Sequence, residues 1–366
     1  MTFRALAPTL AALLAMAAPA AVAQTPSAPK WPNQKEGDFV IKDFHFKSGE
    51  TLPALNIHYT TLGTPKRNAA GDITNAVILL HGTSSSGKAW LSQDLADELF
   101  APGQALDAAQ YFIVLPDGIG RGGSAKPSDG LKGKFPHYRY EDIVASEHQL
   151  LTEGLGIKHL RLVMGSSMGG MHTWMWGYTY PDLMDGLIPI ASQPIQISGR
   201  NWLQRRIAAE AIRQDPGWNN GFYDKNPTQW TVTAPYGFLQ TENVLQLQKM
   251  FPTREAGDEM YKKLQEEAKH RDANDTLWGI EAVMDYNPAP HLKDIKARLM
   301  AINSGDDEAN PPQIASTERE IKKIPNAKYV LVPASEDTHG HYTHLRASFW
   351  KAYVAEFLKD LPAQQM

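Results

Sequence analysis

Six short runs of apolar, β-favouring residues recur along the chain, and most of the segments between them have helical periodicity. Within each run the apolar residues are consecutive, which is typical of strands buried on both faces. The segments between them are amphipathic, as in residues 141–155 (EDIVASEHQLLTEGL). Buried strands that alternate with helices predict an α/β fold, in which a mostly parallel sheet has helices on both faces. The runs are AVILL (76–80), YFIVL (111–115), LRLVM (160–164), GLIPIA (186–191), ARLMAI (297–302) and KYVLV (328–332).

Two parts of the chain depart from this alternation. Residues 38–46 and 52–63 alternate apolar and polar positions around a Ser-Gly-Glu turn, which predicts an antiparallel hairpin. Between the fourth and fifth runs lies a long segment with helical patterns and many large aromatic residues, but without a clear buried strand. We therefore predict a helical cap, residues 196–290, inserted into an α/β core formed by residues 38–195 and 291–366. Such a cap would cover the carboxyl edge of the sheet, where open α/β sheets bind ligands.

The first 23 residues have the features of an export signal. Arg4 is followed by an apolar run rich in Ala and Leu, and Ala21-Val22-Ala23 forms an A-x-A cleavage site. An uncleaved membrane anchor is the alternative, but Pro8 and Pro19 interrupt the run, and much of it is weakly hydrophobic Ala. We expect cleavage after Ala23, a flexible lead-in over residues 24–37, and a periplasmic or secreted protein without a stable membrane anchor.

The composition excludes several classes of function. Lys and Arg number 36 against 40 Asp and Glu, and no run of like charges stands out, so no nucleic-acid partner is expected. The absence of cysteine excludes thiol nucleophiles and cysteine-based metal sites. Residues 118–123 (GIGRGG) resemble a dinucleotide-binding loop, but no helical pattern opens directly after them, so we expect no cofactor. The predicted partner is a small-molecule ester substrate, and a homodimer is compatible with the sequence.

One short motif indicates a nucleophile. The run LRLVM leads into Gly165-Ser166-Ser167-Met168-Gly169, which fits G-x-S-x-G and precedes a helical pattern. At such a tight strand-to-helix turn the serine is held in a strained conformation, and only small neighbours avoid collisions. The pattern favours Ser167 as the nucleophile of an α/β-hydrolase fold, whereas an ordinary tight turn is the alternative interpretation.

A serine nucleophile needs a general base that is itself held by a carboxylate. In α/β-hydrolases these partners follow the serine in the order acid, then histidine. An acidic segment, residues 306–308 (DDE), follows the fifth run, and one of its two aspartates is expected to be only part of a solvated turn. His339, His341 and His344 follow the sixth run and also resemble a metal cluster, but no helical H-E-x-x-H pattern supports a metal site. We choose His341 as the base because Gly340 suits a tight turn that presents the ring.

Two backbone N–H groups are expected to form an oxyanion hole. One belongs to Met168, the residue after the nucleophile, and the other comes from the loop that follows the run AVILL. This loop is HGTSSSG (81–87), and its small residues let backbone donors approach a developing negative oxygen. We choose Thr83 as the second donor, although an ordinary Gly/Ser loop would have the same composition.

Several further segments occur in the order that one known family also has. They are ALD (105–107), FP (135–136) before YED (140–142), GSSMGGM (165–171) and DPGW (215–218). With these segments, most of residues 50–345 resembles the homoserine O-acetyltransferase family of α/β-hydrolases. The resemblance implies Ser167, Asp307 and His341 as the catalytic triad, because the acid of that family stands four residues before a proline, here Pro311.

The chain departs from this family in two places. The family usually follows its catalytic histidine with an aspartate that receives the amine of homoserine, whereas Tyr342 stands there in this chain. Residues 229–235 (QWTVTAP) replace the usual continuation of the cap. Acetyl-CoA is also a cytoplasmic metabolite, which disagrees with an export signal. The resemblance therefore implies the fold and the triad, but not the acceptor.

These features predict an exported serine hydrolase that cleaves an ester or related acyl bond through an acyl-enzyme on Ser167. The alternative is an acyltransferase of the homoserine O-acetyltransferase type, which moves the acyl group to an alcohol. A third hypothesis is a binding module whose triad is idle.

Overall fold

The computed structural model describes residues 30–362. The predicted export signal and most of the predicted lead-in lie outside these residues. Within residues 30–362, no helix combines the length and the apolar character that crossing a bilayer requires. The lead-in was predicted to extend to residue 37, but the first strand begins at Lys35. Just before it, Trp31 is buried against the ring of Phe100, so this end of the segment is already part of the core.

An eight-stranded sheet forms the centre of the molecule, in the order β1-β2-β4-β3-β5-β6-β7-β8. The hairpin β1–β2 is antiparallel and β2 runs antiparallel to β4, whereas all the other neighbouring strands are parallel. The prediction of a mostly parallel sheet is thereby confirmed. The strands are β1 (Lys35–His45), β2 (Thr51–Leu62), β3 (Ala76–Leu80), β4 (Phe112–Pro116), β5 (Leu160–Ser166), β6 (Met184–Ile190), β7 (Arg298–Ser304) and β8 (Ala327–Val332).

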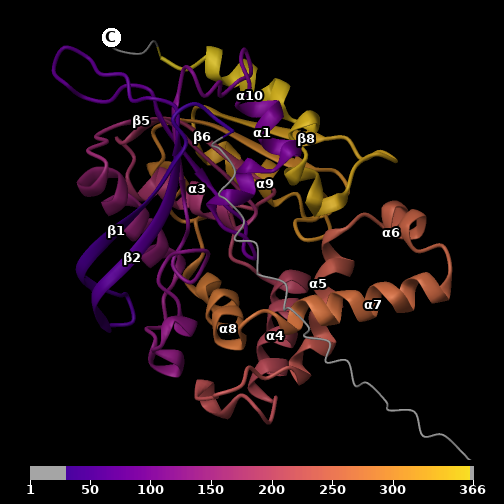
Figure 1. The fold of residues 1–366 in the computed structure, drawn as a ribbon. Helices are drawn as coiled ribbons and strands as arrows, with labels where there is room; N and C mark the ends of the chain where they lie inside the picture. Colours follow the sequence, from indigo (N-terminus) through magenta and orange to yellow (C-terminus); the bar gives the residue numbers. More distant parts are fainter. Residues whose placement is uncertain (1–29, 363–366) are drawn as a thin grey trace, which may run out of the picture.

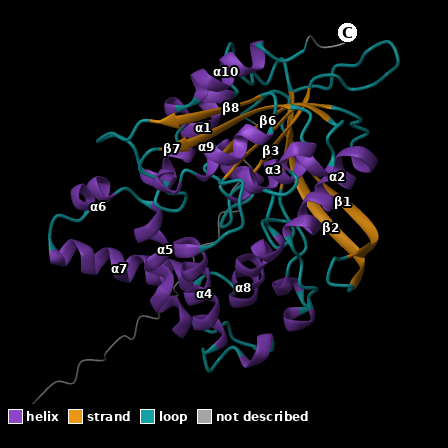
Figure 2. Ribbon diagram, turned by 180° about the vertical axis from the view of Figure 1, so that it is seen from behind, coloured by secondary structure: helices purple, strands orange, loops and turns teal. Residues whose placement is uncertain are grey.

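Helices cover both faces of this sheet (Figure 2). Along β3, Val77 and Leu79 pack in the layer of α1 (Gln93–Leu99) and α10 (Lys351–Lys359). Ile78 and Leu80 pack in the opposite layer, with α2 (Tyr140–Gln149) and α3 (Met168–Thr179). Successive side chains of a strand point to opposite faces, so a strand covered on both sides must be apolar at every position. This explains why the strands read as continuous apolar runs.

The segment between β6 and β7 folds as a group of helices beside the core (Figure 1, salmon and orange). Its five α-helices, α4 to α8, lie within the region predicted as the cap. In this group α4 packs against α8, and α5 packs against α7. The loops that follow β7 and β8 reach this cap through hydrogen bonds to the short connection between α5 and α6. The cap helices are α4 (Gly199–Arg213), α5 (Ala234–Thr241), α6 (Val244–Met250), α7 (Arg254–Lys269) and α8 (Ala273–Glu281), and α9 (Ser316–Glu320) follows in the core.

Candidate active site

Ser167 stands at the turn between β5 and α3, where the G-x-S-x-G motif predicted a nucleophile. Its backbone has φ 57° and ψ −116°, a conformation that residues other than glycine rarely adopt. A hydrogen bond to the neighbouring strand stabilises the turn: the N–H of Ser167 donates to the carbonyl of Ile190 in β6 at 2.9 Å. It is also tightly packed: a Cβ on Gly169 would lie 2.1 Å from the carbonyl oxygen of Leu80 in β3. The glycine of the motif therefore lets α3 begin directly against the sheet.

The structure brings the three predicted triad residues together. Nε2 of His341 is 2.9 Å from Oγ of Ser167, and Nδ1 of His341 is 2.8 Å from Oδ2 of Asp307. With the proton on Nδ1, the imidazole donates to the carboxylate and leaves Nε2 free to accept the serine hydroxyl. Asp307 is 1% exposed and His341 is 7% exposed, so the bond between them is shielded from water, whereas the bond to the half-buried Ser167 is partly accessible.

The carboxylate of Asp307 is fully satisfied by its surroundings. Oδ1 accepts the backbone N–H groups of Ala309 and Asn310 at 2.8 and 2.9 Å, and Oδ2 accepts Nδ2 of Asn310 at 3.0 Å as well as His341. Burial raises the pKa of Asp307, but the charge of His341 and these hydrogen bonds outweigh it, and the pKa lies below its ordinary value. Asn310 was not predicted from the sequence, because an Asn just after an acidic loop is common in ordinary turns.

The neighbouring acid, Asp306, is not the solvated turn residue that was expected beside the triad acid. Its carboxylate accepts hydrogen bonds from the side chains of Ser304, Asn243 and Thr338 and from the backbone N–H of Gly340. Burial raises the pKa of Asp306, but these hydrogen bonds lower it further than burial raises it. The residue pattern left the two aspartates open, but the family resemblance implied Asp307 as the triad acid, and Asp307 is the one that contacts His341.

Both predicted oxyanion donors lie beside the nucleophile. A Cβ on Gly82, the residue before Thr83, would lie 3.6 Å from Cβ of Ser167, so this loop runs next to the serine. Met168 is the first residue of α3, where N–H groups have no partner within the helix. Among residues 30–362, neither the N–H of Thr83 nor that of Met168 donates to another protein group. Both donors are therefore available to a substrate oxygen.

His81 fixes the shape of this loop. Its Nδ1–H donates to the carbonyl of Gly82 at 2.8 Å, and its Nε2 accepts the N–H of Gly118 at 2.9 Å. Burial lowers the pKa of His81 to about 4, which keeps the ring neutral and able to make both contacts. Asp117 closes the arrangement by accepting the N–H of Gly87 at 2.7 Å and that of Gly123 at 2.8 Å. The glycine-rich segment that resembled a dinucleotide loop thus folds around a carboxylate of the protein itself.

The other two histidines of the H-x-H-x-x-H pattern have separate roles. Nδ1–H of His344 donates to the carbonyl of His341 at 2.6 Å, and burial lowers the pKa of His344 to about 3. Nδ1 of His339 lies 3.1 Å from a carboxylate oxygen of Glu242 in the cap. Within residues 30–362, no three His, Asp or Glu side chains are grouped as metal ligands.

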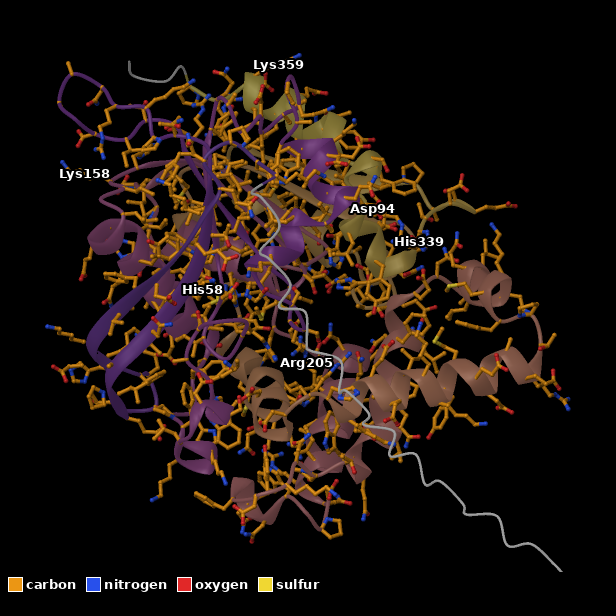
Figure 3. The ribbon with its side chains drawn as sticks, viewed as in Figure 1. His58, Asp94, Lys158, Arg205, His339 and Lys359 are labelled. Carbon is orange, nitrogen blue, oxygen red and sulfur yellow. The ribbon has the colours of Figure 1, made fainter. Side chains whose placement is uncertain are left out.

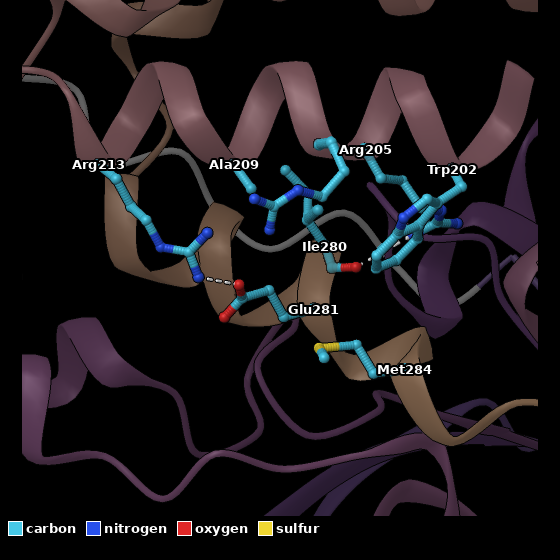
Figure 4. Close-up of a pocket in the computed structure, with 8 residues that line it drawn as sticks. Trp202, Arg205, Ala209, Arg213, Ile280, Glu281 and Met284 are labelled. Carbon is cyan, nitrogen blue, oxygen red and sulfur yellow. Dashed lines mark hydrogen bonds and ion pairs between the residues drawn. The ribbon is translucent and has the colours of Figure 1, made fainter. Parts of the chain in front are cut away.

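A small cavity lies in the cap between α4 and α8 (Figure 4). Arg213 pairs with Glu281 across it, and Nη1 of Arg205 donates to the carbonyl of Ile280 at 3.4 Å. Its volume is about 140 Å³, below the roughly 300 Å³ at which ligand pockets usually begin. No triad residue borders it, so we do not assign it to the substrate. Its lining consists of Trp202, Arg205, Arg206, Ala209, Arg213, Ile280, Glu281 and Met284.

Comparison with known proteins gives a consistent family. The family model described as the alpha/beta hydrolase fold matches residues 75–341. A probable acyltransferase of Methanothermobacter thermautotrophicus is 31% identical over 325 residues, which cover 85% of this chain and 96% of that protein. A homoserine O-acetyltransferase of Moorella thermoacetica is 36% identical over 200 residues, covering 49% of this chain and 50% of that protein.

Solved structures share the fold of this chain. The crystal structure of esterase E22 superposes with a TM-score of 0.77 at 20% identity, covering 89% of this chain and 100% of that chain. At this identity the likeness concerns the fold. The sequence relatives favour an acyltransferase, the alternative of the sequence analysis, over the hydrolase that was its first choice.

Proposed function

Since this chain belongs to the α/β-hydrolase family, we propose that it transfers an acyl group from an ester or thioester to an alcohol through an acyl-enzyme on Ser167. The observation that carries the proposal is the continuous line of hydrogen bonds from Asp307 through His341 to Ser167. The choice of an alcohol as acceptor follows the acyltransferase names of the sequence relatives.

In the first half of the reaction, Oγ of Ser167 attacks the carbonyl carbon of the donor while Nε2 of His341 takes the hydroxyl proton. The carbonyl oxygen becomes an oxyanion, and the N–H groups of Met168 and Thr83 stabilise it. The intermediate then collapses, and His341 gives its proton to the leaving alcohol or thiol. Asp307 holds the ring in the required tautomer and stabilises the imidazolium that forms between the two proton transfers.

In the second half the same groups work in reverse. His341 takes the proton of the acceptor hydroxyl, and the acceptor oxygen attacks the acyl carbon on Ser167. The second intermediate breaks its bond to Oγ of Ser167, which recovers the proton from His341. One acyl–oxygen bond forms as another breaks, so no cofactor is needed to balance the step.

Hydrolysis is the second candidate, and Tyr342 favours it. This residue follows His341 where the family resemblance implies an aspartate for the amine of homoserine, and its ring lies 6.3 Å from that of Phe238 in α5. An ammonium group beside two aromatic rings would lack the carboxylate that balances its desolvation. Homoserine is therefore a poor acceptor for this site, and water or a less polar alcohol would take its place.

The test uses p-nitrophenyl acetate as donor and a panel of alcohols as acceptors. The initial burst of p-nitrophenol gives the rate of acylation, and its steady release gives the overall turnover. Mass spectrometry of the products gives the share of acetyl transferred to each alcohol. We expect at least one alcohol to be acetylated with saturation, and O-acetylhomoserine to stay at the level of a Ser167→Ala control. Transfer to water alone at every alcohol concentration would replace the proposal by hydrolysis, and absence of any acetyl release would contradict both.

A further inference from the structure

The connection between α5 and α6 of the cap lies directly against the loop that carries the catalytic histidine. Gly340, the residue before His341, has φ +57°. A Cβ at this position would lie 3.0 Å from the carbonyl oxygen of Thr241 and 3.1 Å from the backbone nitrogen of Asn243. Only glycine permits both this backbone conformation and this close approach. The cap and the histidine loop therefore meet one residue away from the base.

Asp306 joins these two segments to the sheet. Its Oδ1 accepts the hydroxyl of Ser304 at the end of β7. Its Oδ2 accepts Nδ2 of Asn243 from the cap, together with the hydroxyl of Thr338 at 2.7 Å and the N–H of Gly340 at 3.1 Å from the histidine loop. The donors Asn243 and Thr338 are 6% and 1% exposed, whereas Asp306 itself is half-buried. A single carboxylate oxygen thus collects donors from the cap and from the loop.

A second contact also connects the cap with the histidine loop. The side chain of Glu242 is 6% exposed, and its Oε1 lies 3.1 Å from Nδ1 of His339 in the histidine loop. The same oxygen accepts the backbone N–H of Asn243 at 2.9 Å. Figure 3 shows His339 at the edge of the core that faces the cap. Two adjacent cap residues are therefore bonded to the stretch of chain that leads into His341.

We propose that Asp306 is a positioning residue that makes the alignment of His341 depend on the seating of the cap. If the connection between α5 and α6 moves away, Asp306 loses the donor of Asn243 and Gly340 loses the backbone against which it rests. The loop is then free to shift His341 relative to Ser167, although Asp307 still bonds the ring. This inference rests on the proposed acyl-enzyme, and it adds that the cap controls the alignment of the base.

The first test removes the contact from each side. Asp306→Ala should lower kcat for p-nitrophenyl acetate by about 10- to 100-fold while KM stays within about twofold, because a small displacement of a catalytic group lowers the rate by this order. Asn243→Ser should lower kcat in the same direction, since serine still caps α6 at Leu245 but loses the amide donor to Asp306. Asp306→Asn should retain most of the activity, because its amide oxygen can face the same three donors while Ser304 turns to accept.

A reagent that needs no acceptor separates this inference from the proposed function. The rate at which a fluorophosphonate labels Ser167 should fall in Asp306→Ala and Asn243→Ser by the same factor as kcat. The double variant of Asp306→Ala and Asn243→Ser should be labelled no more slowly than Asp306→Ala alone, since both changes remove the same hydrogen bond between the cap and Asp306. Thr253→Ala, which removes the side-chain cap of α7 elsewhere in the cap, should label at the wild-type rate.

The results that contradict the inference are equally specific. Wild-type labelling rates in Asn243→Ser, or additive losses in the double variant, would show that Asp306 has no positioning role while the proposed function stands. A lower melting temperature with unchanged kcat in Asp306→Ala would likewise show a purely structural role for this residue. A wild-type protein that the fluorophosphonate does not label would overturn the acyl-enzyme itself, and the inference with it.

Discussion

The core and the cap bury their apolar side chains to very different extents. Every residue of β3, β4 and β5 is buried, whereas α6 has no buried residue and α4 buries only Ala209 and Ile212. Among residues 30–362, eleven of the fifteen exposed large apolar side chains lie within residues 196–290. The side chains of the core are therefore held in a single arrangement by close packing, and this arrangement fixes the turn that carries Ser167. The cap is less constrained by packing.

Polar contacts connect these two regions. The hydroxyl of Ser128 donates to Asp275 of α8 at 2.6 Å, and Arg200 of α4 pairs with Glu308 beside the triad acid. With the contact of Asp306 described above, the cap is bonded to the loops that supply the acid and the base. The comparison teaches that the core sets the geometry of the nucleophile, while the cap can adjust the groups that act on it.

The largest effect is expected where the core carries the chemistry. Asp307→Asn should lower kcat by about 10⁴-fold, because an amide in place of the carboxylate favours the wrong tautomer of His341. Asp337→Asn is the matched control in the histidine loop, since Asp337 is exposed and its carboxylate forms no hydrogen bond or ion pair among the described residues. Steady-state kinetics with p-nitrophenyl acetate measures both, and a loss below tenfold in Asp307→Asn would remove this residue from the triad.

One substitution made in both regions tests the difference in packing. Leu162 in β5 is 0% exposed, and Leu203 in α4 is 61% exposed. Leu162→Ala should lower the free energy of unfolding by about 2–5 kcal/mol, and Leu203→Ala by less than about 0.5 kcal/mol. Urea denaturation at neutral pH gives both values. Equal losses would mean that the face of α4 is packed against something in solution, and the comparison would fail.

The smallest effect, taken per pH unit, concerns a carboxyl group buried inside the core. Glu147 of α2 is fully buried, and among residues 30–362 its carboxyl group accepts only Nε1 of Trp176, at 3.2 Å. Burial raises its pKa from 4.5 to about 8. Between these two values the folded chain keeps a proton that the unfolded chain releases, so stability falls as the pH rises. The slope should be about 1.4 kcal/mol per pH unit from this group.

Glu147→Gln should flatten this slope, because the amide keeps an acceptor for Trp176 but does not titrate. Unfolding free energies at pH 5, 6, 7 and 8 compare the variant with the wild type. Parallel curves for the two proteins would show that Glu147 is ionised in the folded state, and that the core is less sealed than the structure indicates.

Much of the core could be predicted from the sequence, because strands buried on both faces leave continuous apolar runs. AVILL was placed on β3 without error, and the other five runs fall within two residues of the observed strands. The positions of Ser167 and His341 followed from a motif and from chain order. These are local signals, and the fold preserves them.

The hydrogen bonds around the triad left no local pattern in the sequence from which they could be predicted. Asp306 and Asp307 both follow β7, and the family resemblance implied Asp307 as the triad acid but gave no role to Asp306. The partner of Asp306 in the cap, Asn243, lies 63 residues earlier in the chain, and no periodicity or motif links the two. Asn310 likewise acts through a hydrogen bond whose geometry a sequence does not encode.

The most direct test of the central claim is to locate the reactive serine. The wild-type protein, Ser167→Ala and Ser166→Ala are each treated with a fluorophosphonate, and peptide mass spectrometry identifies the labelled residue. The wild type and Ser166→Ala should carry one phosphonyl group on Ser167, and Ser167→Ala should carry none. Labelling that persists in Ser167→Ala, or a wild-type protein that stays unlabelled, would contradict an acyl-enzyme on Ser167.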